Sequence, residues 1–333
     1  MKKDYLKVVR NFLLSNKISV FLLIIFVFQY LLSGKVWFWN IFSVTPPIFF
    51  TLIYLIGLVW VIIKKNIQGL AILLICFPFA IYSSDITFKL YSDQPSEDSQ
   101  TVKVFNWNTE FWQFEDKAKF FEFLLEQQAD VYHLQEHILL NKNGYFIELD
   151  DLEEIKSIFK GYTIVKKTEF LTITKLPIVK SFSEGESYYL RVDVQVGRNI
   201  LSLYNVHMPV HINASILPDI YKFAVDLKHR FDFRNQEFEK LIQDIKSNNN
   251  AFYISGDFNT TKSMGKIHEV LDLGKDAAYA GDNLLNATWS VNNIRLWRID
   301  YNIVHKGLKV ISYRELNPGS LSDHWAQLVT IQF

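Results

Sequence analysis

Two short polar motifs in the C-terminal half of the chain place carboxylates beside other polar side chains at the edges of apolar runs. Gly256-Asp257-Phe258-Asn259 follows the run Ala251–Ser255, and Ser322-Asp323-His324 precedes the run Ala326–Ile331. A strand end holds its side chains on a rigid backbone and can aim them into a cleft. Carboxylates, amides and histidines held in this way can bind a metal ion and move protons, so these motifs predict a metal-assisted phosphoryl-transfer centre.

Four further motifs of the same kind occur at the boundaries of other apolar runs. They are Phe105-Asn106-Trp107-Asn108, Leu134-Gln135-Glu136, Tyr204-Asn205-Val206-His207 and Arg298-Ile299-Asp300-Tyr301. Alone, each motif has an ordinary explanation, since strands followed by a solvated acid or by a capped turn are common. Together, the six motifs favour one site that is assembled from several strand ends.

The elements that must position these motifs lie in the C-terminal two thirds of the chain. Strands are predicted at eight short apolar runs: Val102–Trp107, Val131–Leu134, Leu171–Ile173, Leu190–Val196, Ile200–Val206, Ala251–Ser255, Ile299–Val304 and Ala326–Ile331. Two helices are predicted from apolar stripes, one formed by Ala118, Phe121, Leu124 and Leu125 and the other by Phe238, Leu241, Ile242 and Ile245. This alternation predicts an α+β fold in which two packed sheets are flanked by helices.

The six motifs, in this order, resemble those of the endonuclease/exonuclease/phosphatase superfamily, which has the DNase I-like fold. The resemblance covers about residues 102–333, with further matches at Thr172–Ile178 and at Thr288-Trp289. It implies a four-layer α/β/β/α sandwich. It also implies a metal-dependent hydrolase that acts on ester bonds, as a phosphodiesterase or a phosphatase.

The resemblance assigns metal binding to a first group of residues. Asn108 and Glu136 match the family's Mg²⁺-binding amide and carboxylate, with Mn²⁺ as the alternative ion. A few hard oxygen ligands suit Mg²⁺, because this ion keeps several of its own waters. Asp323 is expected to bind the metal or to lie next to a metal ligand.

Catalytic roles fall on a second group. His207 matches the histidine that stabilises charge on the phosphoryl oxygens, and Asp257 and Asn259 match the pair that orients the attacking water and the phosphate. His324 matches the general acid/base, and Asp300 matches the carboxylate that fixes its tautomer. In the same motif as His207, Asn205 is expected to contact the substrate.

Residues 1–84 differ in composition from the rest of the chain. They contain eight Lys or Arg and one acid, which leaves residues 85–333 with 27 basic and 34 acidic residues, a net charge of −7. Three apolar stretches predict a membrane anchor with transmembrane helices at about 18–36, 46–63 and 68–84. A cleaved signal peptide is the alternative for the first stretch, and a buried or re-entrant helix is the alternative for the third.

The basic residues predict how this anchor is oriented. Those near the N-terminus favour a cytoplasmic N-terminus, and Lys64 and Lys65 lie on the loop between the second and third spans, again inside. Three crossings then place the polar linker at 85–101 and the catalytic domain at 102–333 on the extracytoplasmic side of the cell membrane. This organisation resembles the membrane-anchored branch of the family that is associated with teicoplanin and vancomycin resistance.

The expected substrate is a phospholipid or an isoprenoid (pyro)phosphate. The segment 211–230 is rich in apolar residues and begins four residues after His207, so it predicts a lid or a bilayer-facing wall, with an ordinary core-packed helix as the alternative. An extracytoplasmic nuclease acting on DNA or RNA is a second interpretation, which the acidic net charge disfavours. A catalytically inactive binding module is a third, and the intact motifs argue against it.

Overall fold

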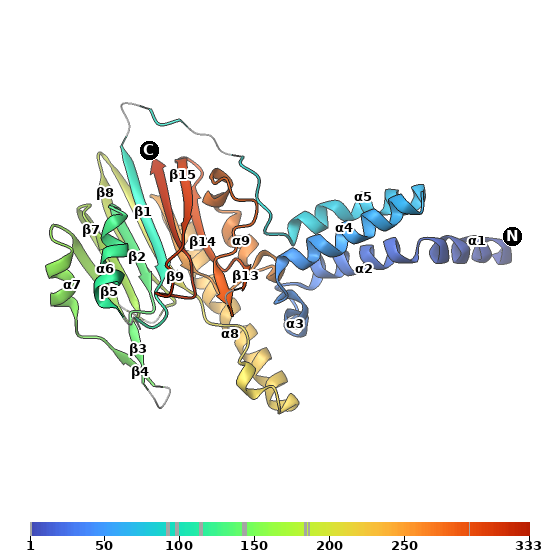
Figure 1. The fold of residues 1–333 in the computed structure, drawn as a ribbon, viewed down its shortest axis with the longest axis horizontal. Coiled ribbons are helices and arrows are strands. Elements are labelled where there is room, and N and C mark those ends of the chain that lie inside the picture. Colours follow the sequence, from blue (N-terminus) through green and yellow to red (C-terminus); the bar gives the residue numbers. More distant parts are fainter. Residues whose placement is uncertain are drawn as a thin grey trace. The chain divides into compact units, whose positions relative to one another are not determined.

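The computed structural model describes residues 2–90, 94–96, 100–112, 116–141, 145–182, 185, 187–292 and 294–333. The chain forms two compact units (Figure 1). One contains Met1–Ile86 together with Thr261–Lys266, and the other contains Thr87–Thr260 together with Ile267–Phe333. Part of the predicted linker, residues 91–93 and 97–99, lies outside the described residues.

The first unit is helical. Its helices are α1 (Lys2–Ser15), α2 (Lys17–Leu32), α3 (Asn40–Ser43), α4 (Pro47–Ile63) and α5 (Ile67–Tyr82), with a 3-10 turn, η1, at Trp37–Trp39. Proline at the first position of α4 and the side chain of Asn66, which accepts a hydrogen bond from the Gly69 amide, fit the starts of α4 and α5. Leu22, Phe26 and Leu73 lie in the core between α2, α4 and α5.

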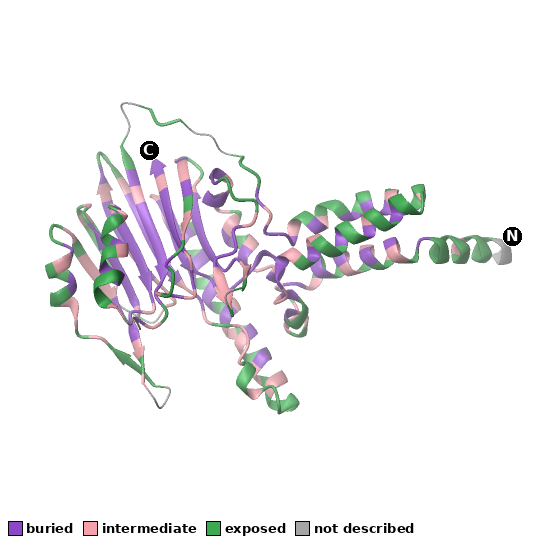
Figure 2. Cartoon of the chain, viewed as in Figure 1, coloured by how far each residue is buried: buried purple, intermediate pink, exposed green. Residues whose placement is uncertain are grey.

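Figure 2 shows many exposed residues along the helices of this unit, and large apolar side chains such as Phe21, Ile56 and Ile63 are among them. By length and hydropathy no single helix among the described residues suffices to cross a membrane. Two pairs pass that test only when their halves are joined across a bend: Tyr5–Ser15 with Lys17–Leu32, bent by 83°, and Trp37–Ser43 with Pro47–Ile63, bent by 70°. The predicted spans overlap α2, α4 and α5, but α2 ends at Leu32 because Ser33 is extended and Gly34 has a φ of +71°.

The second unit contains two six-stranded sheets. The first has the order β15-β16-β1-β2-β6-β5, and the second has the order β11-β14-β10-β9-β8-β7. The first sheet is built from β1 (Thr101–Asn108), β2 (Val131–Gln135), β5 (Thr163–Lys167), β6 (Phe170–Thr174), β15 (Lys309–Leu316) and β16 (Ala326–Gln332). The second is built from β7 (Ile178–Phe182), β8 (Tyr189–Val196), β9 (Asn199–His207), β10 (Ala251–Asp257), β11 (Gly274–Asp276) and β14 (Asp300–His305).

Helices cover the outer faces of both sheets. On the first sheet lie α6 (Lys117–Glu126) and α7 (Leu152–Ile158), and on the second lie α8 (Ile220–Ser247) and α9 (Ile267–Leu271). Val104, Val192, Leu201 and Val329 belong to the apolar core between the sheets, whose strands Figure 2 shows as largely buried. The four-layer α/β/β/α sandwich is therefore confirmed.

Two short hairpins extend the sandwich. They are β3 (Ile138–Leu140) with β4 (Phe146–Glu148), and β12 (Trp289–Val291) with β13 (Ile294–Trp297). All eight predicted strands are present. The sequence does not predict the four edge strands β5, β7, β11 and β15, because their short or mixed polar sequences carry no clear apolar run.

The helix predictions need one correction. The stripe Phe238, Leu241, Ile242 and Ile245 is buried on α8 as predicted. On α6, however, the buried residues are Phe120, Phe121 and Leu124, whereas Ala118 and Leu125 are exposed. The helix is rotated because the aromatic ring of Phe120 stacks on Trp107 of the sheet, with 5.2 Å between ring centroids.

Candidate active site

The ends of five strands meet at one edge of the sandwich. Strands β1 and β2 are parallel and end at Asn108 and Gln135, and β9 and β10 are parallel and end at the register partners His207 and Asp257. Strand β14 runs antiparallel to β10 and begins at Asp300, opposite Asp257. Carboxyl ends of parallel strands are a common place for functional side chains. The predicted residues of these motifs are therefore brought together.

Asn108, Glu136 and Asp257 form the centre of the site. The Asn108 Nδ2 atom lies 3.0 Å from Glu136 Oε1 and 3.1 Å from Asp257 Oδ2. Glu136 has a φ of +61°, an uncommon backbone conformation for a residue other than glycine. Such strain often accompanies functional positions. The other Glu136 oxygen accepts a hydrogen bond from the Phe111 amide at 3.0 Å, which fixes the carboxylate.

His324 and two aspartates form one side of the site. His324 Nδ1 lies 3.0 Å from Asp300 Oδ2, and His324 Nε2 lies 3.8 Å from Asp257 Oδ2. Burial alone would lower the pKa of His324, but the negative charges of Asp300, Asp257 and Asp323 outweigh it and raise the pKa to about 10. These charges favour the protonated imidazole, and the contact with Asp300 orients the ring.

Ser322 and Trp107 hold His324 in place. The Ser322 hydroxyl accepts from the His324 amide at 3.0 Å and donates to the Asn108 carbonyl at 2.8 Å. The Trp107 indole donates to the His324 carbonyl at 2.9 Å. The Ser-Asp-His motif is thus tied to the end of β1, which explains why a serine precedes the acid and the histidine.

His207 forms the opposite side of the site. Its Nε2 atom lies 3.6 Å from Glu136 Oε1 and 3.8 Å from Asp257 Oδ2, and its Nδ1 atom lies 3.1 Å from Glu169 Oε2. Burial disfavours the cation, but the charge of Glu169, followed by those of Glu136 and Asp257, raises the pKa of His207 to about 10. Two positively charged histidines therefore flank the central carboxylates.

Glu169 is a contact of His207 that the sequence does not predict. It lies in the turn between β5 and β6, next to Thr168, whose φ is +47°. In the sequence it follows Lys166, Lys167 and Thr168, so it looks like a solvated acid in a hairpin turn. No local pattern pairs it with His207, which lies 38 positions further along the chain.

Asp257 is a buried carboxylate between these groups. Burial and the nearby charge of Asp300 raise its pKa to about 6, although His324 and His207 oppose the rise. The Asn259 amide donates to Asp257 Oδ1 at 2.7 Å, and the Asn259 side chain donates to the Met208 carbonyl at 2.9 Å. Asn259 has a φ of +46°, so this tight turn joins the ends of β9 and β10.

Asp323 and Asn205 occupy different positions relative to the centre. Asp323 is 38% exposed and accepts from the Trp289 indole at 2.7 Å, while its other oxygen lies 3.7 Å from His324 Nε2. It therefore borders the site beside His324.

The structure does not bring Asn205 to the site as a substrate contact. Its side chain is fully buried between the sheets, where it donates to the carbonyls of Leu134 and Leu171 at 3.1 and 3.0 Å. Its oxygen accepts from Gln135 at 2.6 Å. Asn205 therefore joins the two sheets, because each of its hydrogen-bonding groups is used internally.

The residues present fit a divalent cation. The Asn108 amide lies within 3.1 Å of a carboxylate oxygen of Glu136 and of Asp257, and no Lys or Arg ion pair to either acid occurs in the described part of the chain. Asp257, Asp300 and His324 form a second group whose ligand atoms lie within 4.8 Å of one another. The Asp300 Oδ1 atom is buried and has no hydrogen-bond partner among the described residues, as expected where an ion or substrate group completes the site.

A two-sheet α/β sandwich with carboxylates, an amide and two paired histidines at its strand ends defines a hydrolase of the DNase I-like class. The chain belongs to the Endonuclease/Exonuclease/phosphatase family, whose model matches residues 105–324. It is a phosphoesterase of this family. No curated protein matches the chain closely enough to count as a relative.

Solved structures agree on the fold. Humanized TDP2 from D. rerio is 14% identical, with 69% of this chain and 98% of that chain covered and a TM-score of 0.50. Truncated TDP2 from Caenorhabditis elegans is 17% identical, with 69% and 97% covered and a TM-score of 0.50. A family protein from Bacteroides thetaiotaomicron is 16% identical, with 72% and 97% covered and a TM-score of 0.50. At these identities the similarity concerns the fold alone.

Proposed function

We propose that the protein is a Mg²⁺-dependent phosphoesterase that hydrolyses a phospholipid or isoprenoid (pyro)phosphate at the extracytoplasmic surface of the cell membrane. One observation carries the chemistry: Asn108 contacts both Glu136 and Asp257 within 3.1 Å, and the cationic His207 and His324 each lie within 3.8 Å of Asp257. This arrangement combines a metal-binding group with a proton acceptor and two proton donors.

Asn108 and Glu136 would hold the metal ion, with Mn²⁺ as an alternative to Mg²⁺. A bound divalent ion neutralises charge on the phosphoryl oxygens, which otherwise repel a nucleophile. As placed, Asn108 turns Nδ2 toward the two carboxylates and accepts from the Glu110 amide through Oδ1 at 3.1 Å. Turning this amide over would present Oδ1 to the ion and would give up the hydrogen bond from the Glu110 amide.

Asp257 and His324 would move the protons. Asp257, with a pKa of about 6, is largely ionised at neutral pH and accepts the proton of the attacking water. The water oxygen bonds to phosphorus, the ester P–O bond breaks, and His324 donates its Nε2 proton to the departing oxygen. His207 donates a hydrogen bond to a phosphoryl oxygen, and Asn259 holds the turn that orients Asp257.

Exposed apolar side chains near the site support a lipid substrate. Within the predicted segment 211–230, Ile220 and Tyr221 are each 80% exposed on the first turn of α8. Tyr145 and Phe146 of the β3–β4 hairpin are 70% and 65% exposed, and this hairpin begins two residues after Glu136. In Figure 1 the hairpin and the first turns of α8 both project beyond the lower edge of the sandwich.

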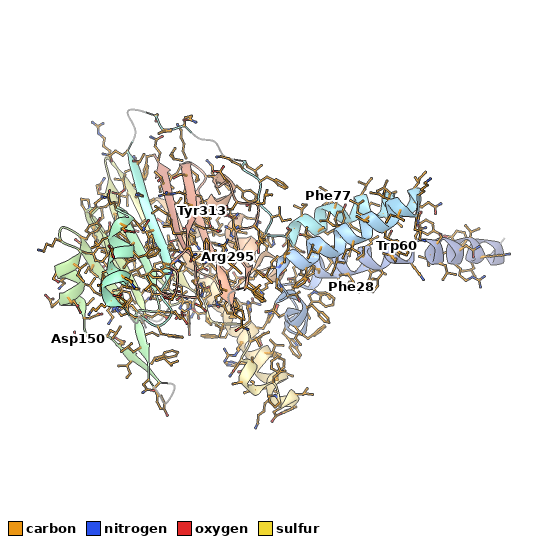
Figure 3. All side chains as sticks on the ribbon, viewed as in Figure 1. Phe28, Trp60, Phe77, Asp150, Arg295 and Tyr313 are labelled. Atoms are coloured by element: carbon orange, nitrogen blue, oxygen red, sulfur yellow. The ribbon has the colours of Figure 1, made fainter. Side chains whose placement is uncertain are left out.

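The helical unit supports the membrane location. Phe28, Trp60 and Phe77, labelled in Figure 3, are 47%, 47% and 50% exposed on its helices. A large exposed apolar surface is unfavourable in water and favours a hydrocarbon environment. The membrane anchor would consist of the two bent helix pairs, one formed by α1 and α2 and the other ending in α4, together with α5. Lys64 and Lys65 would then lie on the cytoplasmic side.

The test uses the full-length protein with Mg²⁺ against phospholipids, undecaprenyl pyrophosphate and plasmid DNA. An Asp257→Ala/His324→Ala variant serves as the inactive control. We expect turnover of a lipid phosphate by the native protein alone. Clear DNA cleavage without lipid turnover would replace the lipid proposal by the nuclease, and no turnover of any phosphate ester would favour the inactive binding module.

The contribution of α8 is tested separately. Ile220→Ser/Tyr221→Ser should reduce turnover of a long-chain lipid phosphate more than that of a short-chain soluble analogue. Val179→Ser on the edge strand β7 is the matched control, since Val179 is 52% exposed but lies outside the site motifs. An equal loss on both substrates would remove α8 from substrate recognition.

A further inference from the structure

A pocket of about 420 Å³ opens in the helical unit, where α1 leads into α2 and α4 leads into α5. It lies at the bend of 83° between α1 and α2. The pocket belongs entirely to the helical unit and shares no residue with the phosphoesterase site.

The charged residues that line this pocket are basic. Lys17 and Lys64 both line it, and the lining contains no Asp or Glu. Within the described ranges, no carboxylate lies within ion-pair distance of either lysine. Two exposed ammonium groups that share a concave site without a counter-ion favour an anionic ligand.

Helix ends of both polarities line the pocket, namely the starts of α2 and α5 and the ends of α1 and α4, so its net positive charge comes from the lysines. The pocket is lined by Asn16, which precedes the 16-residue helix α2, and by Asn66, which precedes the 16-residue helix α5. Asn66 Nδ2 donates to Asn16 Oδ1 at 2.9 Å, so the two helix starts are held side by side. Each helix N-terminus carries a partial positive charge, and anions bind readily there.

The remaining lining is apolar and aromatic. Leu14, Ile18 and Val61 contribute aliphatic surface, and Trp60 lies beside Lys64, whose Nζ atom is 5.0 Å from the centre of the ring. Tryptophan and lysine together are typical of the depth at which lipid headgroups meet the hydrocarbon layer. A phosphate bound to the lysines would leave the adjoining chain against these apolar side chains.

We propose that this pocket binds a phosphate-bearing anion through Lys17 and Lys64, with the headgroup of an anionic phospholipid and free inorganic phosphate as the two sources of that chemistry. Basic pockets between helices at the cytoplasmic side of a membrane are suited to anionic headgroups. The lipid source rests on the membrane location in the proposed function. The site would tie the helical unit to anionic lipid independently of catalysis.

The test measures lipid retention by the full-length protein in detergent, using native mass spectrometry with phosphatidylglycerol and phosphatidylcholine. We expect preferential retention of phosphatidylglycerol. Each lysine near an anionic surface contributes roughly a fivefold gain in affinity, so Lys17→Gln/Lys64→Gln should weaken this binding by about 30-fold. Lys65→Gln, which removes a charge from the same loop but outside the pocket lining, should leave it unchanged.

A second arm adds inorganic phosphate to lipid-free protein and follows the melting temperature. A rise in melting temperature that disappears in Lys17→Gln/Lys64→Gln identifies free phosphate as a ligand. If the melting temperature does not rise but lipid retention depends on the lysines, the ligand is the lipid headgroup. The proposal would be overturned if phosphate gave no lysine-dependent response and the lipid arm also failed. The lipid arm fails if both lipids are retained equally or if Lys65→Gln has the same effect as the double variant. Hydrolysis of a soluble phosphodiester, measured on the same samples, reports the proposed function separately.

Discussion

Asp257 on β10 lies directly opposite Asp300 on β14 in the antiparallel ladder, so two buried carboxylates share one strand pair. Their mutual repulsion contributes to the raised pKa of Asp257. The His324 ring relieves this repulsion, since it contacts Asp300 through Nδ1 and approaches Asp257 through Nε2. The charge of Asp300 therefore acts on Asp257 and on His324 at the same time.

Replacing Asp300 by Asn should lower the pKa of His324, because the largest stabilising charge on the imidazolium is lost. His324 would then lose its proton at a lower pH. We expect the alkaline limb of the kcat profile to move to lower pH and kcat to fall by about 10²–10⁴-fold. Asp323→Asn, at an exposed and more distant carboxylate, should shift the limb less. An unmoved limb in Asp300→Asn would argue against His324 as the acid.

Glu169→Gln should lower the pKa of His207, since the charge of Glu169 is the main factor that raises it. The His207 ring would then be neutral at a lower pH and would stabilise phosphoryl charge less. Histidine NMR titration and the kcat/KM profile measure these effects. Glu169→Asp, which keeps the charge, should retain more activity. If Gln and Asp variants behave alike, the charge of Glu169 is not what positions His207.

Mg²⁺ should raise the melting temperature of the native protein, because a ligand that binds only the folded state stabilises it. Glu136→Gln should abolish this rise and the activity together. Glu148→Gln on β4 is the control, since that carboxylate is exposed. A rise that survives in Glu136→Gln but is lost in Asp300→Asn would place the ion at the Asp257–Asp300–His324 group instead.

The sequence predicts the strand ends well because apolar runs and polar motifs are both local. Asn108, Glu136, His207, Asp257, Asp300 and His324 meet at one edge, although some are separated by more than two hundred residues. The sequence could not predict the Glu169–His207 pair or the inward position of Asn205. Both depend on how the two sheets face each other, and that packing leaves no periodic pattern in the chain.

His133 makes stability depend on pH. It is fully buried, and its Nδ1 atom lies 2.7 Å from the Ser255 hydroxyl. Burial lowers its pKa from 6.5 to about 3. Between these values the unfolded state binds the proton and the folded state does not, so the contribution of His133 to stability falls as the pH falls, by about 1.4 kcal/mol for each pH unit. The raised pKa of Asp257 acts in the opposite direction below about pH 6.

Urea unfolding between pH 7 and pH 4 measures this loss. His133→Gln should flatten the slope, because the titrating group is removed. His229→Gln, at an exposed histidine on α8, should keep the native slope. If the slope is the same in all three proteins, another group controls the acid sensitivity.

Arg298 and Asp276 form a buried ion pair beneath the start of β14. The two guanidinium nitrogens lie 2.8 and 2.5 Å from the carboxylate oxygens, and Arg298 is fully buried two residues before Asp300. Arg298→Met would leave the Asp276 charge buried without this partner, which costs about 3–5 kcal/mol. Arg298→Met/Asp276→Leu removes both charges and should recover much of the loss, as measured by urea unfolding. Because Arg298 positions the strand that carries Asp300, Arg298→Met should also lose activity. If Arg298→Met is as stable as the native protein, β14 is held by its backbone hydrogen bonds to the neighbouring strands alone.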